Sequence, residues 1–196
     1  MVQITNWDAI PDAAEYERPT PGGHIGTIVD YEDHEELNRN GKGQYLKLYW
    51  DFAEGPLTGS LNEAYLRLGY WFGYGTFIRS YKENAMPYFK AFKTCLEVSN
   101  PRYVFQTNNL DAMKGKRIGV VLGEEEYRRN DGTVGTRLYV AQVRSVKAIQ
   151  EGDFKVPELK KLGGQSASSI PGQPVPAWAA YNDDVPPLPD DGDIPF

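Results

Sequence analysis

The chain has 196 residues, of which 40% are hydrophobic and 24% charged, and its formal net charge is −6. This length suits one domain with appendages and is too short for two full domains, and the composition is that of an ordinary globular protein. A single cysteine, Cys95, excludes a disulfide framework, and no apolar run approaches the roughly 18 residues of a membrane span. The N-terminal sequence also lacks the basic and apolar blocks of a secretion signal, so we expect a cytoplasmic protein.

The acidity is confined to the end of the chain. From Gln165 onward the sequence has five Asp and no Lys or Arg. Removing these five from the 27 acidic residues leaves 22 against 21 basic residues in 1–164, so the body of the protein is nearly neutral. Such asymmetry between segments distinguishes an acidic tail from an acidic domain.

After an N-terminal extension (1–20), the first elements have the features of β-strands. The segment 22–33 is rich in β-branched residues, and the dipeptide Asn40-Gly41 is a turn signal. The segment 44–52, "QYLKLYWDF", alternates strictly between apolar residues and a second set that includes Tyr, Lys and Asp. We predict a further extended region over 57–78, with glycines at bulges or bends.

One helix and a hairpin complete the domain. The segment 83–101 predicts an α-helix with Asn84 as N-cap and Pro87 in its first turn. The segment 115–146 predicts a hairpin around Asn130-Asp131-Gly132, because glycine tolerates the positive φ that a tight turn requires. Strands, one helix and a closing hairpin are the element order of a mostly β, five-stranded antiparallel barrel of the oligonucleotide-binding (OB) type over 21–162. An antiparallel sandwich with one helix is the alternative, and the helix can either brace the barrel or form the face of a homodimer.

Residues 163–189 are rich in Pro, Gly and Ser and show no helical or strand period, which predicts a disordered linker. The linker leads to an acidic tip, 190–196, with the sequence "DDGDIPF". An apolar end flanked by acids suits a pocket on another protein that is rimmed by Lys or Arg.

Signals for an enzyme are weak, and we expect no catalytic residue, cofactor or metal. His24 and His34 have no metal-ligand spacing, and Cys95 lies on an apolar helix face, where a thiol keeps a high pKa. The run Glu124–Glu126 could indicate a Mg²⁺-dependent nuclease, because clustered carboxylates bind Mg²⁺. Neighbouring residues on a strand point to opposite faces, however, so at most two of the three carboxylates converge. A nuclease that uses Glu124 and Glu126 is therefore the less favoured hypothesis.

Aromatic and basic residues interleave in three segments, which favours single-stranded nucleic acid as the ligand. Rings stack on unpaired bases while Lys and Arg neutralise the phosphates between them. The first segment lies on the polar face of 44–52, the second in 67–82 and the third in the hairpin. The candidate DNA-binding residues are Tyr45, Lys47, Tyr49, Arg67, Trp71, Arg79, Tyr127, Arg128, Arg129, Arg137 and Tyr139.

Two parts of the sequence resemble known proteins. The tip, with Asp190, Asp191 and Asp193 before Ile194, Pro195 and Phe196, resembles the C-terminus of bacterial single-stranded DNA-binding proteins, which also follows a Pro/Gly-rich linker. The body, over roughly 20–162 and including "GDFKVPELKKL" at 152–162, is similar to a family of phage-encoded proteins that bind single-stranded DNA.

The resemblance implies a protein of phage DNA replication, recombination or repair in the cytoplasm of the bacterial host. It would coat single strands without reading their sequence and would recruit a helicase, polymerase, primase or recombinase through its tip. Two alternatives remain besides the nuclease: an annealing protein of a recombination system, and an adaptor that docks on host enzymes through its tail and binds no DNA.

Overall fold

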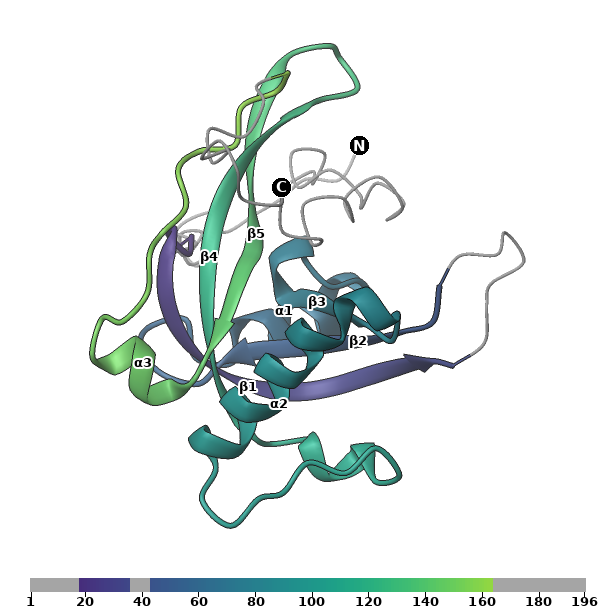
Figure 1. Ribbon diagram of the computed structural model, residues 1–196. Coiled ribbons are helices and arrows are strands. Elements are labelled where there is room, and N and C mark those ends of the chain that lie inside the picture. Colours follow the sequence, from purple (N-terminus) through teal and green to yellow (C-terminus); the bar gives the residue numbers. More distant parts are fainter. Residues whose placement is uncertain (1–17, 36–42, 164–196) are drawn as a thin grey trace, which may run out of the picture.

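The computed structural model describes residues 18–35 and 43–163. The predicted linker and acidic tip, apart from Gly163, and most of the N-terminal extension lie outside the described residues. The described chain is mostly β, with few helices (Figure 1). The strands are β1 (Gly22–His34), β2 (Tyr45–Phe52), β3 (Thr76–Ser80), β4 (Arg117–Arg128) and β5 (Val134–Arg144); the helices are α1 (Ser60–Leu68), α2 (Met86–Ser99) and α3 (Val146–Gln150).

All five strands form one antiparallel sheet in the order β3-β2-β1-β4-β5. The central strand β1 is long enough to serve two partners: residues 22–27 pair with β4, and residues 26–34 pair with β2 across an irregularity between Ile28 and Asp30. In the part of the chain that the structure describes, no pairing joins β3 to β5, so the sheet is open. The five antiparallel strands of the predicted barrel are confirmed as one sheet, and hydrogen bonds among the described residues do not close that sheet into a barrel.

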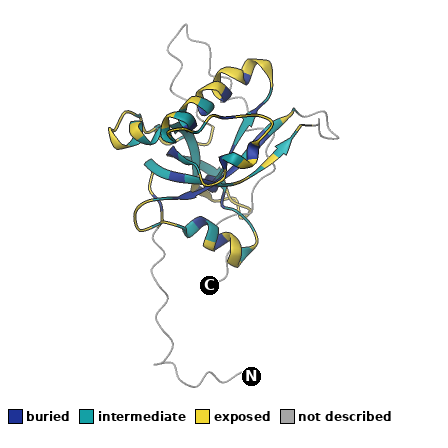
Figure 2. Cartoon of the chain, turned by 90° about the horizontal axis from the view of Figure 1, so that it is seen from below, coloured by how far each residue is buried: buried dark blue, intermediate teal, exposed yellow. Residues whose placement is uncertain are grey.

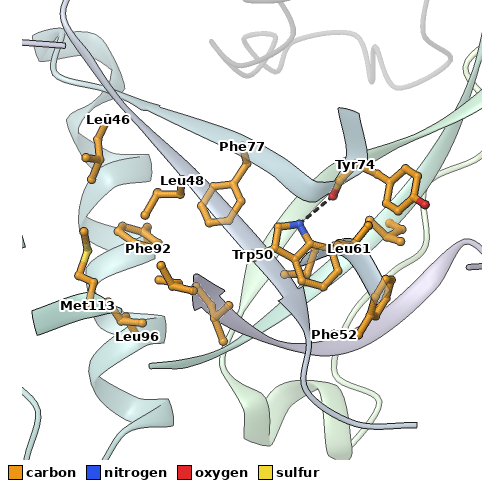
Figure 3. Packing of buried hydrophobic residues seen from close by; sticks show 14 of the residues in the cluster. Leu46, Leu48, Trp50, Phe52, Leu61, Tyr74, Phe77, Phe92, Leu96 and Met113 are labelled. Carbon is orange, nitrogen blue, oxygen red and sulfur yellow. Dashed lines mark hydrogen bonds between the residues drawn. The ribbon is translucent and has the colours of Figure 1, made fainter. Parts of the chain in front are cut away.

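The core lies between the sheet and α2. The alternation in β2 directs Leu46, Leu48, Trp50 and Phe52 inward, as predicted, and all four are buried (Figure 3). Trp50 also donates a hydrogen bond from Nε1 to the carbonyl of Tyr74 over 2.7 Å, so its one polar group is satisfied. Helix α2 adds a buried stripe of Phe89, Phe92 and Leu96 and leaves its other side exposed (Figure 2).

Three sequence predictions about helices are wrong. The region 57–78 is not extended throughout, because residues 60–68 form α1. The described residues form three α-helices where one was expected. Gly69, one of the glycines that suggested a bulge, instead caps the end of the helix, and Gly59 caps its start; both have φ of 80°, a conformation that suits glycine. Asn84, the expected N-cap of α2, lies in a 3₁₀ turn, and Ala85 takes the cap position.

The predicted hairpin is confirmed as β4 and β5, and its far half projects from the rest of the sheet (Figure 1). We call this half, residues 123–139, the arm. Gly132 in the turn has φ of 84°, and the Asp131 carboxylate accepts hydrogen bonds from the amide and hydroxyl of Thr133. After α3, residues 153–162 run back beside the arm; we call them the strap (Figure 1). The strap is held by backbone bonds from Glu126 N to Lys160 O (2.8 Å) and from Lys160 N to Glu124 O (3.0 Å).

Candidate functional site

The outer face of β2, opposite the core, carries the first group of predicted DNA-binding residues. Tyr45 lies at the start of the strand, with its ring centroid 4.4 Å from that of His34. Lys47 is 4.8 Å above the centre of the Tyr49 ring, and its Nζ is 3.7 Å from the Glu32 carboxylate on β1. The positive charge on this face is therefore already partly neutralised by β1.

Tyr49 is more enclosed than the alternation alone predicts. Only 8% of the residue is exposed, and its hydroxyl donates to the Glu32 carboxylate. Burial and the bond to Glu32 raise the pKa of Tyr49, so the phenol stays protonated at neutral pH. Desolvation opposes ionisation of Glu32, but hydrogen bonds from Tyr49 and His34 and the charge of Lys47 outweigh it, so the pKa of Glu32 lies below its ordinary value.

Three rings from three parts of the chain meet beside β2. The Trp71 ring contacts two others. Tyr49 lies 5.3 Å away between ring centroids with the planes tilted by 47°, and Tyr65 of α1 lies 5.2 Å away with nearly parallel planes (19°). We call Tyr49, Trp71 and Tyr65 the aromatic ladder. Tyr49 is its buried end and Tyr65, which is 40% exposed, is its open end.

Tyr65 is the residue that sequence reasoning missed. The glycines of 57–78 suggest an extended region, although the same segment also has the residue spacing of a helix. Leu61, Ala64 and Leu68 recur at the three- and four-residue intervals of an amphipathic helix, and Leu61 and Ala64 are buried. Tyr65 follows Leu61 by one turn, which is the signal that would have placed its ring on the side facing the sheet.

Asp51, the last polar residue of the outer face, anchors the helix that carries Tyr65. Its carboxylate accepts hydrogen bonds from the amides of Leu61 and Asn62, both over 3.0 Å, and from that of Phe52 over 2.7 Å. Two of the amides at the start of α1, which have no partner within the helix, are thereby satisfied by a neighbouring strand. Asp51 is buried, so this remote cap fixes α1 against β2.

Arg67 and Arg79, also predicted to bind DNA, lie away from the ladder. Arg67 is exposed on α1, two residues after Tyr65 and hence about 200° around the helix. Arg79 lies on the core face of β3, with its guanidinium 4.8 Å from the centre of the Phe77 ring and 5.7 Å from that of Phe92.

The guanidinium of Arg79 is enclosed, and desolvation lowers its pKa to about 10. Its Nη1 donates to the Ile78 carbonyl over 2.8 Å, whereas its Nε is buried and has no hydrogen-bond partner among the described residues. Arg79 therefore belongs to the interior between β3 and α2 and not to the outer face of β2.

The aromatic and basic residues of the arm are largely engaged with the strap or with one another. Arg137 donates from Nε to Glu125 over 2.8 Å, and its guanidinium lies 5.4 Å from the centre of the Tyr127 ring. Tyr139 packs against Gly123, where a Cβ would come within 3.1 Å of the Tyr139 ring and 2.7 Å of Pro157 in the strap. The strap thus covers one face of the β4–β5 hairpin.

The end of the arm is different. Arg128 and Arg129 are exposed there, beside the turn. Within residues 18–35 and 43–163, Arg128 forms no ion pair, whereas the Nζ of Lys160 is 3.6 Å from Glu125 and 5.7 Å from the centre of the Tyr139 ring. Among the arm cations, Arg128 is therefore open to an external anion.

Two carboxylates of the acidic run and the thiol of Cys95 have structural partners. Glu125 pairs with Arg137 and Lys160, and Glu126 accepts from the amide of Leu162 over 2.9 Å. Burial raises the pKa of Cys95, whose Sγ lies 3.7 Å from the Val143 carbonyl. In the described residues there is no group of three or more His, Cys, Asp or Glu side chains that could hold a metal ion, and no helix there is long and apolar enough to cross a membrane.

Comparison of the sequence with models of known protein families gave no match, and comparison with curated protein sequences also gave none.

Proposed function

We propose that this protein binds single-stranded DNA without sequence preference and that its sheet is a variant of the OB fold. The observation that carries the proposal is the aromatic ladder, three rings in contact whose open end is a 40% exposed tyrosine stacked on Trp71 beside the outer face of β2. Stacking on such rings tolerates any base, because every base has a π-face. Tyr49 is enclosed and Trp71 contacts both tyrosines, which gives Tyr65 a rigid support.

The topology supports the OB variant. Strands in the order β3-β2-β1-β4-β5, with a helix between β3 and β4, follow the succession of an OB barrel. The edge strands β3 and β5 are bridged by packing: α2 contacts both strands, and the 3₁₀ turn Gly73–Gly75 contacts β5. In this proposal, packing of α2 against both edge strands takes the place of the hydrogen-bonded ladder that would close a barrel.

The placement of the candidate residues agrees with the way OB folds bind nucleic acid. That surface is centred on strands 2 and 3 and on the connections between strands 1 and 2 and between strands 4 and 5. Here Tyr45, Lys47 and the ladder lie at strand 2, and Arg128 and Arg129 lie at the connection between strands 4 and 5. Bases would stack near β2 while phosphates meet the arm.

The tail supplies the second part of the proposal. The sequence of residues 190–196, which lie outside the described structure, supports recruitment of replication or recombination enzymes to the coated strand. In this proposal the protein has no catalytic activity of its own and acts in a phage-infected bacterial cell.

The test is binding of fluorescently labelled dT oligonucleotides by the full chain, followed by anisotropy over a salt series. We expect tight binding at low salt that weakens as salt rises, and weaker binding to a duplex of the same length. Absence of binding to dT at low salt would refute the proposal. Mg²⁺-dependent cleavage of the strand would favour the nuclease instead, and accelerated pairing of complementary strands would favour the annealing protein.

A further inference from the structure

We infer that Tyr65 is the ring on which an unpaired base stacks, with Trp71 behind it as a positioning residue. This inference rests on the proposed function and assigns its base-contacting group to α1, a helix outside the five strands. The sequence pattern had placed the contact on Tyr45, Tyr49 and Trp71. The geometry of the aromatic ladder moves it to the residue at the open end.

The order of the three rings leaves one place for a fourth. Tyr49 is closed off by burial and by its bond to Glu32. Trp71 already has two ring neighbours, Tyr49 and Tyr65, at 5.3 and 5.2 Å between centroids. Tyr65 has Trp71 on one side, and no other ring in the described chain stacks on it. A base that adds to the stack therefore adds at Tyr65.

Anchoring of α1 does not explain the ring. The helix is already fixed by Leu61 and Ala64 in the core and by the Asp51 carboxylate at its first turn. Tyr65 adds a large ring that stays 40% exposed, next to Leu66, which is 75% exposed. Exposed aromatic surface on an already anchored helix is expected where a partner will cover it.

The stack also explains why the ring is preorganised. A free tyrosine must lose side-chain rotamers when it binds a base, which lowers affinity. Tyr65 is held nearly parallel to Trp71 before the ligand arrives, with 19° between the ring planes. Trp71 therefore acts through Tyr65, and its fluorescence should report on a base that it does not touch.

The experiment compares Tyr65→Ala with wild type against two oligonucleotides of equal length, oligo-dT and an abasic strand with the same phosphates. We expect Tyr65→Ala to weaken oligo-dT binding by about 5-fold or more at every salt concentration, with an unchanged salt slope, because no charge is removed. Against the abasic strand the two proteins should bind alike. Tyr65→Phe should behave as wild type in both cases.

Tyr88→Ala is the matched control, because Tyr88 is a tyrosine of similar exposure (37%) on α2. It should bind both strands as wild type does. If wild type binds oligo-dT and Tyr65→Ala binds it equally well, the inference is wrong and the proposed function stands. An equal loss on both strands would also overturn it, since the effect would not involve the base. If wild type binds neither strand, both the inference and the proposed function fail.

Discussion

Two faces of the sheet have the same sequence pattern, aromatic and basic residues at alternating positions: the outer face of β2 and the face of the arm beneath the strap. They differ in whether other parts of the chain cover them. On β2 the rings join a stack that opens to solvent at Tyr65. On the arm, Tyr139 lies against Gly123 and the strap, and Arg137 is paired with Glu125. Alternation therefore indicates which side chains share a face and leaves open whether that face is free.

The cations show the same contrast. Lys47 on β2 and Arg137 on the arm both lie within reach of a carboxylate on the adjacent strand. Arg128, at the end of the arm, has no such partner in the described chain. Substitutions that separate the two regions therefore remove, in turn, the carboxylate that supports the ladder (Asp51), the unpaired cation of the arm (Arg128) and the acid on β1 (Glu32).

The largest expected effect follows loss of the cap on α1. Asp51→Ala leaves two amides of α1 and the Phe52 amide without their acceptor in a buried position. We expect the free energy of unfolding to fall by about 2 kcal/mol, measured by urea denaturation. The near-ultraviolet circular dichroism of the ladder should change as well, because the attachment of α1 weakens.

Asp111→Ala is a suitable control for Asp51→Ala. Asp111 is an exposed aspartate that pairs with Lys114 over 3.2 Å. Its loss should change stability by less than about 0.5 kcal/mol. A similar cost for both variants would show that the Asp51 carboxylate does not hold α1 in place.

A smaller effect should separate the two arginines of the arm. Arg128→Ala should reduce the slope of log affinity for oligo-dT against log salt by about 1, because an unpaired cation releases a counterion when it meets a phosphate. Arg137→Ala should change the slope less, since Glu125 already neutralises Arg137. Equal changes in the two slopes would mean that DNA displaces the Glu125 pair.

The smallest expected effect is a pH dependence of the β1–β2 contact. The pKa of Glu32 lies below its ordinary value of about 4.5 in the folded protein, so its ionised form stabilises the fold above that pH. The contribution is lost as pH falls through the folded-state pKa. The stability difference between wild type and Glu32→Gln should therefore be present at pH 7, at most about 1 kcal/mol, and should shrink below pH 4.5.

Thermal unfolding at pH 7 and at two acidic values would measure this difference. The same comparison in a Tyr49→Phe background is the control, because that change removes the hydroxyl that donates to Glu32. The pH dependence should be weaker there. If it is unchanged, the phenol does not contribute to the lowered pKa.

Local patterns were enough to predict the sheet. Strict alternation identified β2 and its inner face, and the Asn130-Asp131-Gly132 signal located the turn between β4 and β5. These features depend on neighbours within a few residues, so they can be recognised without knowledge of the rest of the fold. Helix α1 was not predicted, because Gly69 suggested a strand bend, although it is the C-cap of the helix.

The candidate site was predicted less well, for a physical reason. The Tyr49 ring contacts Trp71, and the Tyr139 ring lies near Lys160 in the strap. Both partners come from segments about 20 residues away along the chain. Arg79 was assigned to a binding surface because it is charged, yet it packs on Phe77 and Phe92. Which segment covers a strand depends on tertiary contacts, and residue spacing does not reveal these contacts.

The central position of β1 has a consequence for how the chain folds. Its first half pairs with β4, whose residues lie 90 to 100 positions further along the chain, whereas β2 and β3 are near neighbours. During synthesis the β1–β2–β3 meander can form while the other edge of β1 is still unpaired. The long-range pairing of β1 with β4 slows folding. The part of β1 that stays unpaired is "GGHIGT", with three glycines in six residues. Glycine makes a strand a poor template for aggregation, so the segment that stays unpaired longest is also poorly suited to recruit the wrong chain.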